Sequence, residues 1–164
     1  MYRPGHHGTA MLVYAPFGGV LAALGFELLG LLGAMFVFCA AMVPDFDRGV
    51  DWVGRRGFTH TVWFALLFGV VTGLFGTVVR SWLLGLSAEL AFAFGFALGA
   101  FVVVVHIGAD ALTPAGVRPF APLSDRWFHR DSEFAADPPG NYALFGIGLL
   151  ALGMAFLVGG TIAG

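Results

Sequence analysis

The chain has 164 residues, of which 59% are hydrophobic and only 11% are charged, and its formal net charge is −2. A soluble domain carries about 25% charged residues, so this composition excludes an ordinary soluble protein and indicates one integral membrane domain over residues 1–164. The small net charge gives no reason to expect nucleic acid as a partner, and membrane lipids are the expected surroundings.

The first apolar stretch is too long for a single membrane span. It covers about residues 9–43 and is interrupted only by Glu27, whereas one span needs about 20 residues. We therefore expect a helical hairpin, with one helix ending near Leu24, a turn marked by Glu27 and a second helix starting near Phe26. Pro16 is expected to kink the first helix.

Three further apolar segments follow, separated by polar connections. Thr59 is expected to cap the third helix, which would place His60 in its first turn, where the helix dipole favours a neutral, metal-binding imidazole. The expected fold is an all-α, polytopic membrane helical bundle of about five transmembrane helices. The last three are expected at about 59–79, 88–109 and 141–162, after connections at 44–58, 80–87 and 114–140.

Arginine is distributed unevenly between the two membrane faces that five spans imply. One face has only Arg80. The other face has the remaining arginines, which are Arg3, Arg48, Arg55, Arg56, Arg118, Arg126 and Arg130. Cytoplasmic loops carry an excess of basic residues. We therefore expect a multi-pass cell-membrane protein whose N-terminus and two long loops are cytoplasmic.

Histidine and aspartate residues gather at this same face. His106 and Asp110 are four residues apart, so they share one side of a helix, and a cation would offset the unfavourable helix dipole at Asp110. Imidazole and carboxylate groups suit zinc, manganese or iron, and two ions could be held. The candidate ligands are His7, Asp45, Asp47, His60, His106 and Asp110.

Other interpretations stay open at this stage. His6 is expected to be a bystander beside His7, and His129 is expected to belong to an interfacial patch of aromatic and basic residues. Two alternative functions also remain. The first is a non-catalytic membrane protein with a structural metal. The second is a metal-ion transporter, which is less favoured because the ionisable residues lie at one face instead of mid-membrane.

Three motifs carry a resemblance to a known family. They are Val43-Pro44-Asp45-Phe46-Asp47, Arg56-Gly57-Phe58-Thr59-His60-Thr61 and His106-x-x-x-Asp110-x-x-Thr113-Pro114-x-Gly116. Their order and spacing resemble the membrane-bound metal-dependent hydrolases whose bacterial prototype is a LexA-regulated inner-membrane protein. The resemblance spans most of the chain. It implies the ligand roles given above, with His7 as the best match to an early histidine of the family.

The resemblance also implies a reaction. Arg48 and Arg55 stand where the family pattern often has histidine, so we expect them to bind a substrate phosphate instead. The His-x-x-x-Asp element is also similar to one in zinc-dependent phospholipase C and P1-type nucleases, which implies a phosphoester substrate.

The leading hypothesis is a metal-dependent hydrolase, with zinc favoured, that acts on a phosphoester of a lipid or lipid-linked substrate. Asp47 or Asp110 would orient or deprotonate the attacking water. The expected substrate-binding residues are Arg48, Arg55, Arg56 and Thr113.

Overall fold

The computed structural model describes residues 1–49, 56–83, 86–130 and 137–164. Within these ranges the chain is all-α and contains no β-sheet, which confirms the predicted fold class. The helices are α1 (Arg3–Ala23), α2 (Glu27–Ala40), α3 (Val62–Leu83), α4 (Ala88–Ala111) and α6 (Pro138–Ala163), with the 3-10 helices η1 (Val43–Gly49) and η2 (Phe58–His60) between α2 and α3.

Among the residues that the structure describes, four segments are long and apolar enough to cross a membrane. They are Glu27–Asp47, Val62–Arg80, Ala88–Ala111 and Pro138–Ala163. Helix α1 is not among them, and its N-terminal part carries the polar side chains of Arg3, His6 and His7. The described residues thus form five α-helices, as predicted, and four segments have the length and hydropathy that a membrane span needs.

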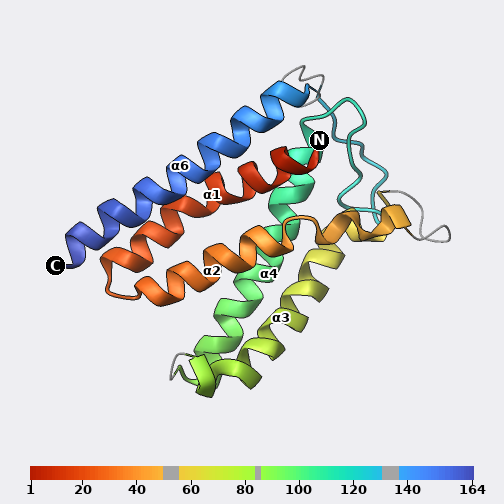
Figure 1. Cartoon of the computed structure of the whole chain (residues 1–164). Coiled ribbons are helices and arrows are strands. Elements are labelled where there is room, and N and C mark those ends of the chain that lie inside the picture. The colour runs from red at the N-terminus through yellow and green to blue at the C-terminus, as the bar shows by residue number, and fades with distance from the viewer. Residues whose placement is uncertain (50–55, 84–85, 131–136) are drawn as a thin grey trace.

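The helices form two groups that diverge from one end of the molecule (Figure 1). Helix α1 packs along α6 and α2, and α3 packs along α4. The N-terminal ends of α1, α3 and α6 meet the C-terminal ends of α2 and α4 at the end where the groups converge. The predicted ligands lie in these terminal segments, so the topology brings them to one end of the bundle.

Close packing of α1 on α6 depends on glycine. A Cβ added to Gly8 would lie 2.5 Å from the backbone of Leu144, and one added to Gly148 would overlap the carbonyl of Gly8. Small residues of this kind let membrane helices approach closely. Asn141 adds a polar contact, since its Oδ1 accepts a hydrogen bond from the Tyr2 backbone nitrogen at 3.1 Å. These contacts fix the start of α1, which contains His6 and His7.

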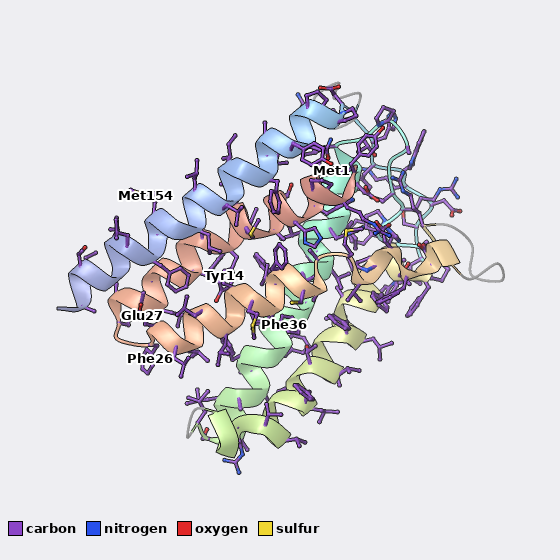
Figure 2. All side chains as sticks on the ribbon, in the orientation of Figure 1. Met1, Tyr14, Phe26, Glu27, Phe36 and Met154 are labelled. Carbon is purple, nitrogen blue, oxygen red and sulfur yellow. The ribbon has the colours of Figure 1, made fainter. Side chains whose placement is uncertain are left out.

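The first hairpin has the predicted form. Glu27 is the first residue of α2 and is exposed, and Figure 2 shows it beside Phe26 at the end of the bundle far from Met1. Between the two helices, Tyr14 donates a hydrogen bond to the Gly30 carbonyl at 2.9 Å. Pro16 lies inside α1.

The start of the third helix differs from the prediction. Helix α3 begins at Val62, and its cap is Thr61, whose Oγ1 accepts a hydrogen bond from the Phe64 backbone nitrogen at 3.3 Å. Thr61 has the extended backbone that a capping residue needs, with φ −118° and ψ 159°. Thr59 and His60 therefore lie in η2, before the helix, and Thr59 is free to contact the site.

Candidate metal centre

Four buried side chains converge where the two helix groups meet. Asp45 comes from η1, His60 from η2, and His106 and Asp110 from the last turns of α4. One potential ligand atom from each residue lies within 4.8 Å of those of the other three. Their exposed fractions are at most 8%. Burying such groups is costly unless they are paired or bind an ion, so the cluster is a candidate functional site.

The distances within the cluster suit a cation. His60 Nε2 lies 3.6 Å from Asp45 Oδ1 and 3.5 Å from Asp110 Oδ2. His106 Nε2 lies 3.7 Å and 3.9 Å from the same two oxygens. These separations exceed those of good hydrogen bonds. They match the spacing of ligand atoms that surround one ion at about 2.0–2.2 Å.

In both His60 and His106 the other ring nitrogen, Nδ1, already has a polar contact. His106 Nδ1 lies 2.8 Å from the Ala41 carbonyl oxygen, which can only accept, so Nδ1 carries a hydrogen. His60 Nδ1 lies 3.0 Å from Thr59 Oγ1 and 3.3 Å from Asp47 Oδ2. Outer contacts of this kind orient metal-binding histidines. Both Nε2 atoms are therefore directed at the carboxylates of Asp45 and Asp110.

The cluster is strongly acidic around His60 in the absence of a cation. Burial lowers the pKa of His60, but the carboxylates of Asp110, Asp45 and Asp47 outweigh burial and raise the pKa above its ordinary value. The site therefore attracts positive charge, whether a proton or a metal ion.

Asp110 lies at the centre of the contacts. Its Oδ2 faces His60 and also lies 3.2 Å from Arg56 Nε, while its Oδ1 lies 3.4 Å from His6 Nε2 and 3.1 Å from the Met1 nitrogen. The side chain is completely buried. One carboxylate thus contacts groups from α1, from the segment before η2 and from η2 itself.

The structure corrects the choice between the two early histidines. His6, which we expected to be a bystander, is 2% exposed and contacts Asp110. His7, the predicted ligand, instead faces α2, where its Nδ1 lies 3.0 Å from the Phe38 carbonyl oxygen and its ring packs on Phe38. Adjacent residues on a helix point about 100° apart, so only one of them can face the cluster.

Asp47 occupies a different position from the one predicted. It is buried, but its Oδ2 accepts hydrogen bonds from the Arg56 backbone nitrogen at 2.7 Å and from Thr59 Oγ1 at 3.1 Å. It meets the Nδ1 side of His60, away from the ligand atoms. Asp47 is thus outside the group of four and is placed to orient His60.

The predicted substrate-binding residues have separate outcomes. Arg56 lines a pocket of about 340 Å³ beside the cluster, together with Gly116, Arg118 and Trp127. Thr113 is buried, and its hydroxyl donates to the Asp110 carbonyl oxygen at 2.7 Å, so it ends α4 and does not face the pocket. Arg55 and the side chain of Arg48 lie outside the described residues.

His129 is exposed and stacks on Trp127, as its assignment to an aromatic patch predicted.

Replacing Asp47 with asparagine is expected to weaken metal binding by about 10- to 100-fold, because outer partners of ligating histidines contribute that much to affinity. Titration against a chromogenic chelator measures the change. Asp125→Asn is the control, because the side chain of Asp125 is 90% exposed and its distance to Arg118 Nη1 is as long as 4.0 Å. Wild-type affinity in Asp47→Asn would show that Asp47 does not orient His60.

Comparison with known proteins places the chain in a family. Neither the search of curated proteins nor the search of solved structures gave a match. A family model described as YdjM inner membrane protein matches residues 1–163. That description supports the predicted membrane location, whereas hydrolase activity and the likeness to zinc-dependent phospholipase C and P1-type nucleases stay predictions. Because the match covers nearly the whole chain, the protein belongs to the YdjM inner membrane protein family.

Proposed function

We propose that this protein is a metal-dependent hydrolase of the inner membrane that acts on a phosphoester of a lipid or lipid-linked substrate. The observation that carries the proposal is the pair of histidines, His60 and His106, whose Nε2 atoms face two buried carboxylates while their Nδ1 atoms are engaged elsewhere.

The donor set fits a divalent cation. The residues that would hold it are Asp45, His60, His106 and Asp110. Two imidazoles and two carboxylates suit zinc best, and manganese or iron would also fit. When bound, the ion supplies Lewis acidity and lowers the pKa of water so that hydroxide is available near neutral pH.

Other residues beside the cluster would handle the substrate. Arg56 lies between the cluster and the pocket, since its Nε is 3.2 Å from Asp110 Oδ2 and its Nη1 donates to the Gly116 carbonyl at 3.1 Å. A guanidinium in this place can bind a phosphate through two parallel hydrogen bonds. Arg118 adds a second positive charge to the same pocket.

The two aspartates that we predicted to act on water receive different assignments in this proposal. In this proposal Asp110 would act as a ligand of the ion and would orient the water held there. Asp47 contacts the far side of His60, so we assign it to positioning. The cytoplasmic location of the site rests on the excess of arginine in the segments around it.

The test combines metal analysis with substrate hydrolysis. Protein purified in detergent is expected to contain zinc in a fixed ratio and to cleave a chromogenic phosphodiester or a phospholipid headgroup bond. His106→Ala should lose both properties, because Nε2 of His106 is a candidate ligand. His7→Ala should keep both, because His7 faces Phe38. Tight metal binding without hydrolysis of any phosphoester would instead support a structural metal.

A further inference from the structure

His6 meets the opposite side of the carboxylate from the other two buried histidines. Its Nε2 lies 3.4 Å from Asp110 Oδ1, whereas His60 and His106 face Asp110 Oδ2. His6 is 2% exposed, and neither of its ring nitrogens makes a hydrogen bond to a described residue. A buried imidazole in this state has lost its hydrogen bonds to water and has gained only a long contact with a carboxylate. A ligand at its Nε2 would satisfy it.

The ring geometry shows that this ligand is not the ion of the first site. His6 and His106 stack with centroids 3.9 Å apart and planes within 3° of parallel. The lone pair of an imidazole nitrogen lies in the ring plane, so the lone pairs of two stacked, parallel rings lie in two separate planes. Because these planes share no point, one ion about 2.0–2.1 Å from each nitrogen cannot lie in line with both lone pairs.

Parallel rings do suit two neighbouring ions. A stacking distance of 3.9 Å between the rings is close to the separation of about 3.5–4 Å between the ions of two-metal sites. The two oxygens of Asp110 are divided in the same way, with Oδ1 on the side of His6 and Oδ2 on the side of His106. A carboxylate with one oxygen on each side is placed to bridge the pair.

We propose that His6 Nε2 and Asp110 Oδ1 bind a second divalent cation beside the one held by Asp45, His60, His106 and Asp110 Oδ2. The inference rests on the proposed function, which supplies the first ion. His6 Nε2 and Asp110 Oδ1 are the side-chain ligands that the described residues offer the second ion, and the Met1 ammonium competes for the same oxygen at 3.1 Å, so this ion should bind more weakly than the first. Its remaining coordination positions would be open to water and to a phosphoryl oxygen, which makes a phosphoester the substrate class that this pair fits.

His7 provides a matched control within the same helical turn. It is the same residue type, one position along α1, and its Nδ1 lies against the Phe38 carbonyl on the surface of α2. Replacing it removes a histidine without touching the cluster. His6→Phe is the second variant, since phenylalanine keeps a ring to stack on His106 but has no ligand atom.

The experiment counts bound ions in the full chain, purified in detergent with a C-terminal tag because Met1 lies beside Asp110. The protein is equilibrated with graded zinc and analysed by mass spectrometry, and with manganese and analysed by electron paramagnetic resonance. Wild type and His7→Ala should bind two ions per chain and show a spin-coupled manganese pair. His6→Ala and His6→Phe should bind one ion and show isolated manganese.

Two outcomes would overturn the second site. One is a wild-type protein that saturates at one ion per chain, and the other is a His6→Phe variant that binds as many ions as wild type. Both leave the first site and the proposed function in place. If wild type binds no ion at any concentration, the proposed function itself fails, so the two failures are distinguishable.

Discussion

Asp110→Asn is expected to remove all tightly bound divalent metal and to reduce phosphoester hydrolysis to the background rate. Asp110 presents both side-chain oxygens to candidate ligands, with Oδ2 near His60 and His106 and Oδ1 near His6. An amide has one oxygen and no charge, so it cannot replace either contact with the same strength. Mass spectrometry of metal content and an assay of phosphodiester cleavage measure the two losses.

The control for this variant must separate loss of the site from loss of the fold. Asparagine is preferred to alanine because it keeps the volume of a fully buried side chain and leaves an oxygen for the guanidinium of Arg56. Asp125→Asn, at a 90% exposed position, should behave as wild type, since exposed pairs contribute little. A folded Asp110→Asn protein with full metal content would refute the ligand assignment.

The helices of this bundle were predictable from hydrophobicity because the membrane imposes a simple condition on sequence. A spanning helix must be apolar over about 20 residues, and α4 and α6 start and end within a few residues of the prediction. The residue that caps the start of α3 was harder to predict. Thr59 and Thr61 can both cap a helix, and the choice depends on the 3-10 turn of η2, which ties His60 and Thr61 to the backbone of residues 57 and 58.

In the site, too, some residues could be predicted from sequence spacing and others could not. His106 and Asp110 were predictable as a pair because a spacing of four residues on a helix fixes their relation. His6 and His7 were not distinguishable, because the residues four positions later, Ala10 and Met11, are both apolar and both buried. The rotation of α1 is set by its contacts with α6 and α2, which sequence periodicity does not reveal in a helix rich in glycine.

Arg56 is held in an unusual conformation that points to a role in binding substrate. Its φ is 58°, a left-handed value that is uncommon for residues other than glycine and that tends to persist at functional sites. Three contacts maintain it, namely the backbone hydrogen bond to Asp47, the contact of Nε with Asp110 and the hydrogen bond from Nη1 to Gly116. The Arg56 side chain is 18% exposed and borders the pocket with Arg118 and Trp127.

Arg56→Ala is expected to lower kcat/KM for an anionic phosphoester by about 100-fold, as removal of one donor to a developing charge does in other enzymes. Metal affinity should stay the same or rise, because a cation 3.2 Å from Asp110 Oδ2 repels a second cation at that oxygen. Arg56→Lys should recover only part of the activity, since lysine keeps the charge but loses the two-pronged geometry.

Because hydrolysis should fall while metal affinity does not, the assignment of Arg56 can be tested against a purely structural role. If Arg56 only held the loop over the cluster, its removal would weaken metal binding and hydrolysis together. Arg126→Ala is the control, because Arg126 is exposed and lies over the Phe128 ring at 5.0 Å, outside the pocket. Parallel titrations of metal and substrate for both variants therefore decide whether Arg56 binds the phosphoester or only stabilises the fold.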